Sequence, residues 1–107
     1  MTQFSNAREV LGFDKKLGRE DLVRALRISI ADEYEAIQIY SQIAEAIDDA
    51  GMKAVIMEIV GEEKKHAGQF WNLLTELDPE EATAFDQAAD ENKKIKEKSR
   101  SRRSSSR

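Results

Sequence analysis

The amino-acid sequence predicts an all-α protein, in which two long helices form an antiparallel hairpin and a short third helix follows. Three observations lead to this fold class. Apolar residues recur at steps of three and four along two long stretches, as they do on one face of an α-helix. A short connection rich in Asp and containing Gly51 joins the two stretches. Five glycines and one proline leave few of the breaks that separate short strands.

The first long helix is predicted to begin at about residue 19 and to end at about residue 49, with acidic residues in its first turn as the helix dipole favours. Gly51 is expected to cap its C-terminal end. The second helix is predicted over about 52–77, and each helix is then ~40 Å long. Asp78 and Pro79 are typical of a helix start, so we expect a third, short helix ending at about Ala89.

Composition divides the chain into three parts. Residues 1–18 form an N-terminal segment without a clear apolar period. Residues 19–92 hold the predicted helical domain. Residues 93–107 contain eight Lys or Arg, one acidic residue and many serines, although the whole chain has a net charge of −4. Such a composition cannot form a packed core, so we expect this basic tail to be disordered.

The composition also excludes several classes of site. The chain has no cysteine, which rules out disulfides, zinc–thiolate sites and iron–sulfur clusters. No apolar run approaches the ~20 residues that span a bilayer, and no targeting core lies near the N-terminus. We therefore expect a cytoplasmic protein with no membrane partner. A metal site would have to be built from carboxylates and imidazole, which suit iron, manganese or zinc.

Three ionisable residues interrupt the two apolar stripes. The first stripe consists of Leu22, Leu26, Ile30, Glu33, Ile37, Tyr40, Ala44 and Ile47, and the second of Met52, Ile56, Ile59, Glu63, His66, Phe70, Leu73 and Leu77. An unpaired carboxylate on a buried face costs several kcal/mol, roughly, so it must be protonated, paired or bound to a cation. Glu63 and His66 lie three residues apart and point the same way.

Each residue alone has a simpler interpretation. His66, the only histidine, could be an ordinary core residue. Glu63 could be a solvated member of the run 62–65, and Glu33 could belong to an acidic surface cluster. Their joint occurrence on two stripes favours metal binding.

Two helices cannot enclose a core, because each stripe leaves half of its width facing water. We therefore expect a homodimer that completes a four-helix bundle. A two-fold dimer would bring together four Glu and two His, the ligand set of di-iron carboxylate bundles. We predict two irons per dimer, bound by Glu33, Glu63 and His66 of both chains, with Zn, Mn or Ca as substitutes.

Other residues have weaker signals. Tyr40 follows Glu33 by two helical turns and could donate a hydrogen bond to a ligand carboxylate, although a core aromatic with a hydrated hydroxyl is an equal alternative. Asp32 and Glu35 flank Glu33 on other faces. They could form a surface entry site for cations, or simply be solvated acids.

These residues resemble the encapsulated ferritins, ferritin-like proteins associated with encapsulin shells. The resemblance rests on the segments 32–37 and 62–67, on Tyr40 and on the helix break at 77–80. It covers about residues 20–88. It implies a ferroxidase that oxidises Fe(II) with O₂ at a di-iron centre across a homodimer, dimers assembled into a ring decamer, and iron storage inside an encapsulin nanocompartment.

The resemblance also assigns roles to single residues. Glu33, Glu63 and His66 match the family's metal ligands, and Tyr40 matches a tyrosine beside them. Asp32 and Glu35 match acidic entry positions, with Asp32 in place of the family's glutamate. The tail departs from the family, because residues 99–107 contain no apolar residue of the kind found in shell-targeting peptides. The chain could also be a fragment of a shell fusion.

Two other functions stay open at this point. One is a di-iron peroxide reductase of rubrerythrin type, although the chain lacks the cysteines for its own electron-transfer iron. The other is a non-catalytic helical interaction module whose basic tail binds nucleic acid. We do not expect a nucleic-acid partner, because a solvated tail explains the same residues.

Overall fold

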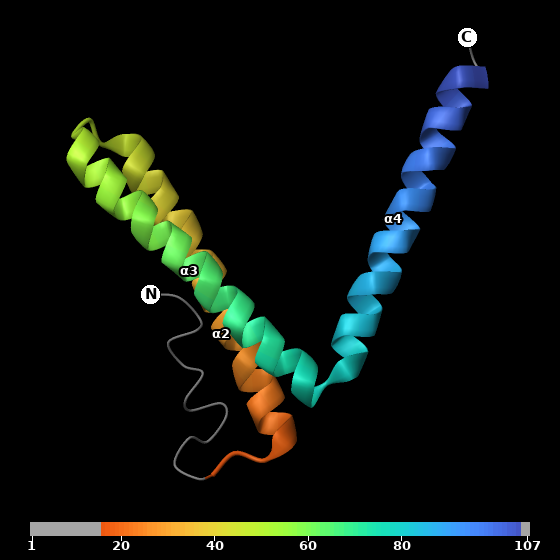
Figure 1. Ribbon diagram of the computed structural model, residues 1–107, viewed down its shortest axis with the longest axis horizontal. Coiled ribbons are helices and arrows are strands. Elements are labelled where there is room, and N and C mark those ends of the chain that lie inside the picture. The colour runs from red at the N-terminus through yellow and green to blue at the C-terminus, as the bar shows by residue number, and fades with distance from the viewer. Residues whose placement is uncertain (1–15, 106–107) are drawn as a thin grey trace. The chain divides into compact units, whose positions relative to one another are not determined.

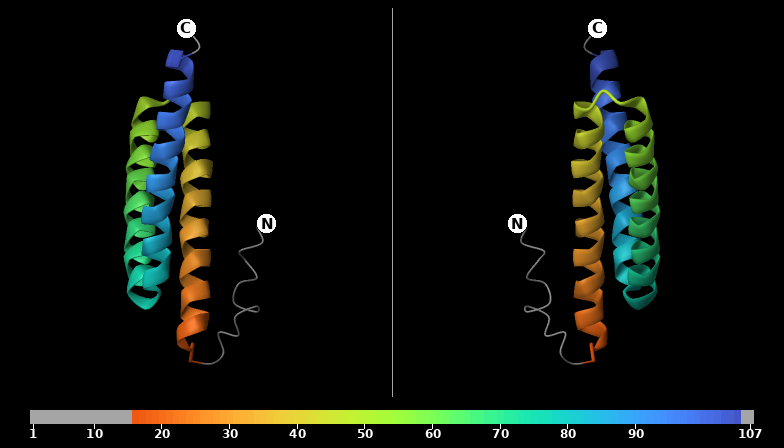
Figure 2. Two further views of the ribbon diagram at one scale, coloured as in Figure 1. Left: turned by 90° about the vertical axis from the view of Figure 1, so that its right-hand side faces the viewer. Right: turned by 90° about the vertical axis from the view of Figure 1, so that its left-hand side faces the viewer.

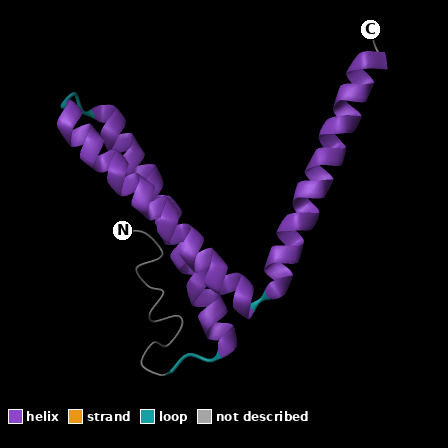
Figure 3. Ribbon diagram, in the orientation of Figure 1, coloured by secondary structure: helices purple, strands orange, loops and turns teal. Residues whose placement is uncertain are grey.

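The computed structural model describes residues 16–105. It contains three helices, α2 (Arg19–Ala46), α3 (Ala50–Leu77) and α4 (Pro79–Ser105), as Figure 1 shows. No strand occurs between residues 16 and 105 (Figure 3), so the predicted all-α class is confirmed. The predicted N-terminal segment lies outside the described residues, except for residues 16–18. The chain divides into two compact units, one ending at Leu77 and one beginning at Asp78.

The first unit is the predicted helical hairpin. α2 and α3 run side by side in opposite directions (Figure 2). The helix start at Arg19 and the helix end at Leu77 agree with the sequence prediction. The connection lies earlier than predicted, because α2 ends at Ala46 instead of about residue 49 and α3 begins at Ala50 instead of about residue 52.

The predicted role of Gly51 is wrong. The C-cap of α2 is Ile47, in an extended conformation with φ −116° and ψ 153°, whereas Gly51 lies inside the first turn of α3. Asp49 explains the difference, because its carboxylate oxygen Oδ1 accepts a hydrogen bond from the backbone N–H of Met52 at 3.0 Å. This is the geometry of an N-terminal cap, so the Asp residues start the second helix rather than Gly51 ending the first.

The opposite end of the hairpin holds the best-packed part of its core. Val23, Leu26 and Leu74 form a buried cluster there. Four partly buried apolar residues pack against it: Ile30, Phe70, Trp71 and Leu77. The Arg19 guanidinium also donates a hydrogen bond to the Leu77 carbonyl. This bond joins the start of α2 to the end of α3.

The predicted second stripe combined two different faces of α3. The residues that α3 buries are Val60, Ala67 and Leu74, at seven-residue spacing. Ile59 and Leu73, which were predicted to be buried, have 42% and 49% of their surface exposed. Positions seven apart repeat every two helical turns, so Ile59, His66 and Leu73 form a separate stripe beside the buried one.

We call this second apolar surface the outer stripe. It comprises Met52, Val55, Ile59, His66 and Leu73 on α3. Every apolar member is among the exposed large hydrophobic residues of the hairpin. A hairpin with two apolar surfaces, only one of them buried, is expected for half of a four-helix bundle.

The third helix is much longer than predicted. It continues to Ser105 instead of ending near Ala89, so residues 93–105, which were expected to be disordered, are helical. Two features explain the difference. No Gly or Pro follows Pro79, and Ala, Glu, Lys and Arg, which favour helices, dominate the segment. Acids lie in the first turn and arginines in the last, as the helix dipole favours.

None of the described helices is long and apolar enough to cross a membrane.

The Asp49 cap can be tested by substitution. We expect Asp49→Ala to lower the free energy of unfolding by about 1 kcal/mol, because it removes the side-chain acceptor at the start of α3. Thermal unfolding followed by circular dichroism measures the effect. Asp48→Ala is the matched control, since it removes the same charge one residue away. Equal losses from both variants would contradict a capping role.

Candidate metal centre

Three side chains from the two hairpin helices meet at about the middle of the hairpin. Glu33 comes from α2, whereas Glu63 and His66 come from successive turns of α3. The hairpin brings them together because Glu33 and Glu63 both lie beside the buried contact of α2 with α3. Each is half-buried, with 17% and 21% of its side chain exposed.

The distances within this group suit a shared cation. His66 Nδ1 lies 3.9 Å from Glu33 Oε2 and 3.7 Å from Glu63 Oε1. One potential ligand atom from each residue lies within 4.8 Å of the other two. Among the described residues, no other group of His, Cys, Asp or Glu meets this criterion. The structure therefore brings together the three residues that the sequence predicted as metal ligands.

The electrostatics of Glu33 show that the protein alone does not satisfy its carboxylate. Glu33 Oε2 is buried and has no hydrogen-bond partner. Burial raises the pKa of Glu33 to about 7, and the hydrogen bond and negative charge of Glu63 act in the same direction. His66 opposes the shift, and the charge of Asp32 adds slightly to it. Two carboxylates this close need a proton or a cation between them.

The third candidate ligand, His66, leaves the site open on one side. The His66 side chain is 46% exposed, and it belongs to the outer stripe between Ile59 and Leu73. The predicted burial of His66 within the hairpin is therefore wrong for a single chain. The two carboxylates are sheltered by the hairpin, while the imidazole faces the same side as the exposed apolar residues.

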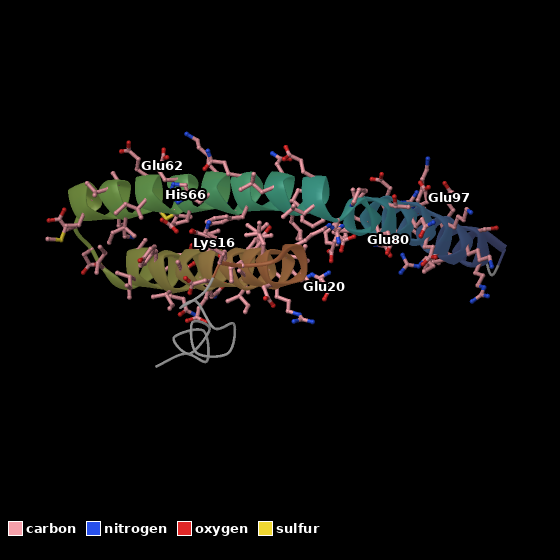
Figure 4. The ribbon with its side chains drawn as sticks, turned by 90° about the horizontal axis from the view of Figure 1, so that it is seen from below. Lys16, Glu20, Glu62, His66, Glu80 and Glu97 are labelled. Atoms are coloured by element: carbon pink, nitrogen blue, oxygen red, sulfur yellow. The ribbon has the colours of Figure 1, made fainter. Side chains whose placement is uncertain are left out.

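The remaining predicted site residues are not part of the cluster. Tyr40 is partly buried on α2, Asp32 is exposed, and Glu35 is partly buried. The metal-ligand group contains none of the three, so their roles stay predictions. Glu62, the neighbour of Glu63, lies on the side of α3 that faces away from α2 (Figure 4). Its carboxylate pairs with the Lys65 ammonium at 3.2 Å.

The residues present fit a metal ion such as iron. Carboxylate oxygens and a neutral imidazole nitrogen are donors that iron accepts. A divalent cation would supply the partner that Glu33 Oε2 lacks and would compensate the charge of Glu63. It would also keep Glu33 ionised, in place of the proton that the metal-free site holds near neutral pH.

Comparisons with known proteins identify the family of this chain. A family model described as Rubrerythrin matches residues 24–104. The chain therefore belongs to the rubrerythrin family of ferritin-like proteins. This match covers α3 completely and nearly all of α2 and α4.

Two similar proteins show which members of the family this chain resembles. The chain is similar to a ferritin-like–encapsulin shell fusion protein of Pyrococcus furiosus, with 35% identity over 77% of this chain and 24% of that protein. It is also similar to the encapsulin nanocompartment cargo protein EncC of Myxococcus xanthus, with 34% identity over 71% of this chain and 58% of that protein. The chain thus matches about a quarter and somewhat over half of these two relatives.

A solved structure extends the likeness to three dimensions. The crystal structure of the encapsulated ferritin domain from Pyrococcus furiosus matches with a TM-score of 0.74 and 34% identity. The match covers 76% of this chain and 83% of that one. The resemblance to encapsulated ferritins found in the sequence is confirmed.

The raised pKa of Glu33 predicts a pH effect in the metal-free protein. The folded state holds the Glu33 proton more tightly than the unfolded state, since the pKa is about 7 against 4.5. The stability from this group is therefore present below pH 4.5 and is lost as pH rises through 7. At pH 8 we expect Glu33→Gln to raise the free energy of unfolding by about 1–3 kcal/mol, because it mimics the neutral form.

Thermal unfolding with a chelator, at a series of pH values, measures this difference. Wild type and Glu33→Gln should agree near pH 4.5, separate progressively between pH 4.5 and 7, and differ by a constant amount above pH 7. Glu35→Gln serves as the control, because it neutralises a nearby acid outside the ligand group. A constant difference between Glu33→Gln and wild type at all pH values would contradict the assignment.

Proposed function

We propose that this protein is a ferroxidase, which oxidises Fe(II) to Fe(III) with O₂ at a di-iron centre formed across a homodimer interface. The observation that carries the proposal is the Glu33–Glu63–His66 group, which has a buried carboxylate oxygen without a partner. Iron is the substrate, and the same residues hold it during oxidation.

Half of the centre comes from each chain in this proposal. One hairpin offers two carboxylates and one imidazole, whereas di-iron bundles use four carboxylates and two imidazoles. A two-fold partner seated on the outer stripe doubles the ligand set. It also covers His66 and the exposed apolar residues around it, such as Ile59 and Leu73. The same contact thus explains the open side of the site and the unburied apolar surface.

The chemistry follows from the ligands. Two Fe(II) ions ~3.5–4 Å apart repel each other and require bridging anions. Four glutamates balance their total charge of +4, and the neutral histidines bind without adding charge. Two Fe(II) ions held as a pair would each give up one electron, and these two electrons, with two protons from solvent, would reduce one O₂ to hydrogen peroxide. Glu33 would release its proton on binding iron, so the site couples iron uptake to proton release.

The names of the relatives support a cellular location for this reaction. One is named a shell fusion protein and another a nanocompartment cargo protein. We therefore propose that the chain works inside an encapsulin nanocompartment, where oxidised iron is stored, and that its dimers form a ring decamer. Asp32 and Glu35 would guide cations toward the site from the surface of α2, and Tyr40 would hydrogen-bond a ligand carboxylate.

A peroxide reductase is the second candidate, because the family model that matches is described as Rubrerythrin. The absence of cysteine argues against it, since the chain cannot bind the cysteine-ligated iron that would feed electrons to the di-iron centre. Peroxide consumption with an added electron donor, faster than O₂ consumption with Fe(II), would favour this candidate over a ferroxidase.

The ferroxidase proposal predicts the behaviour of ligand variants. Adding Fe(II) without oxygen and then admitting air should produce ferric absorbance much faster than in buffer alone. Glu33→Ala, Glu63→Ala and His66→Ala should each slow this by about 10–100-fold or more, because even residues that only support metal ligands have effects of that size. Glu62→Ala is the matched control and should keep the wild-type rate.

Metal analysis on size-separated protein gives an independent readout, with two irons per dimer expected. A wild-type oxidation rate no faster than that of buffer would remove the enzyme assignment. One iron per chain that survives the loss of the dimer would instead show a site complete within one hairpin.

The dimer itself is tested on the outer stripe. Ile59→Glu and Leu73→Glu should each give monomers, because a charge buried against a partner costs several kcal/mol, roughly. Both variants should lose iron binding while keeping their helix content. Met57→Glu is the control, because Met57 is 47% exposed but lies on another face of α3. Sedimentation velocity measures the mass, and dimers formed by Ile59→Glu would contradict the proposed interface.

A further inference from the structure

The charges of α4 are separated along its length. From Pro79 to Asn92 the helix carries five acidic residues and no Lys or Arg, whereas residues 93–105 carry seven Lys or Arg and a single acid, Glu97. Figure 4 marks Glu80 near the start of α4 and Glu97 in its second half. The side chains from Thr83 to Arg103 are all exposed. One continuous helix thus presents an acidic half and a basic half of nearly equal and opposite charge.

The helix dipole accounts for only part of this separation. Its effect falls off within the first and last turns, but each charged half extends over ~20 Å of helix. Asp90 and Lys93 lie in the middle of the helix, where the dipole gives neither sign an advantage. The charges there require another explanation.

The two large apolar side chains of α4 add a second pattern. Phe85 and Ile95 are 60% and 64% exposed, and they lie five residues before and five residues after Asp90. Phe85, Ala88, Asn92 and Ile95 alternate at steps of three and four, so they form one narrow stripe of the kind that pairs helices. The stripe is centred on residue 90, about two residues before the charge changes sign between Glu91 and Lys93.

We propose that α4 pairs in antiparallel orientation with α4 of a second copy of this chain, with the register centred on residue 90. Phe85 then packs against Ile95 of the partner subunit, and Ala88 packs against Asn92 of the partner subunit. The acidic half of each helix lies along the basic half of the other, except at the centre, where Asp90 and Glu91 lie near the same acids of the second copy. Asp86 comes close to Lys96 of the partner subunit, and Glu80 comes close to Lys98 of the partner subunit.

The charge pattern selects this partner and this direction. A parallel pair would place acid against acid and base against base along the whole helix, which is destabilising. A nucleic acid would gain from the basic half but would be repelled by the five acids that precede it. An antiparallel copy, in contrast, sets most of each half against the opposite charge. Because the apolar stripe is short, the ion pairs carry much of the attraction, and added salt should weaken the pairing.

The absence of cysteine in the chain allows a clean cross-linking test in the full-length protein. Ala88→Cys and Asn92→Cys are made in separate preparations, one carrying a mass tag, and the two are mixed and oxidised gently. In the proposed register these two positions face each other across the pair. When both chains carry Ala88→Cys, the two thiols are offset by ~6 Å along the helix, which is unfavourable for disulfide geometry.

The expected result is a mixed disulfide dimer that exceeds the self-linked products of either variant alone. Self-linking of each variant that equals the mixed product would indicate a parallel or random encounter and would overturn the proposal. No disulfide above the level of the same mixture in denaturant would also overturn it. Iron takes no part in this readout, so the result is independent of the ferroxidase proposal.

Charge reversal provides the second measurement in the same cysteine variants. Lys96→Glu with Lys98→Glu should lower the mixed disulfide severalfold, because four ion pairs of the symmetric dimer become repulsive. Adding Glu80→Lys and Asp86→Lys should restore it, since the pattern is then complementary again. The proposal fails if Lys96→Glu with Lys98→Glu leaves the yield of mixed disulfide unchanged and instead abolishes binding of an oligothymidylate. The α4 helix would then be a nucleic-acid-binding surface.

Discussion

The close approach of two carboxylates from neighbouring helices is the constraint on which the rest of this structure depends. Glu33 and Glu63 are both mostly sheltered, and one oxygen of Glu33 has no hydrogen-bond partner. A hairpin built only for stability would place apolar residues at these two positions. The cluster with His66 is instead stable when a proton or a cation separates the two charges. The site therefore has a physical demand for a proton or a cation even before the family is considered.

The carboxylate cluster is also connected to the outer stripe. His66 holds its place in the cluster from a surface that the hairpin leaves exposed, in line with Ile59 and Leu73. In the proposed function, a second hairpin covers these exposed apolar residues and completes the ligand set on the same side. Membership of the rubrerythrin family and the match to an encapsulated ferritin domain agree with a ferritin-like helical fold.

The third helix, α4, is stabilised differently from the hairpin. It buries little of its own surface, and its two large apolar residues, Phe85 and Ile95, are mostly exposed. Its helical conformation is stabilised by strong helix-forming residues and by its acidic and basic blocks, not by a core. Such a helix is well suited to contacts between chains, which is why its charge pattern needs a structural explanation separate from the metal centre.

The sequence by itself determined the helical class, the two hairpin helices and the identity of the cluster. Glu33, Glu63 and His66 could be found because ionisable residues at three- and four-residue steps are costly on an apolar face. The start at Arg19 and the break at Pro79 follow from local backbone preferences, which need no tertiary information. The sequence alone could not predict which of two adjacent stripes on α3 is buried within one chain. One stripe runs through Val60 and Leu74, the other through Ile59 and Leu73, and both carry apolar residues at the same spacing.

Only the tertiary structure decided that choice, because burial depends on which face of α3 meets α2. It also showed that Asp49 caps α3, a hydrogen bond that a turn containing Asp and Gly does not by itself specify. It extended the third helix to Ser105, where composition had suggested disorder. Composition reports whether a segment can form a core, and α4 is a helix that does not depend on one. Periodicity thus encodes the local elements, whereas the contacts between faces are set by three-dimensional packing.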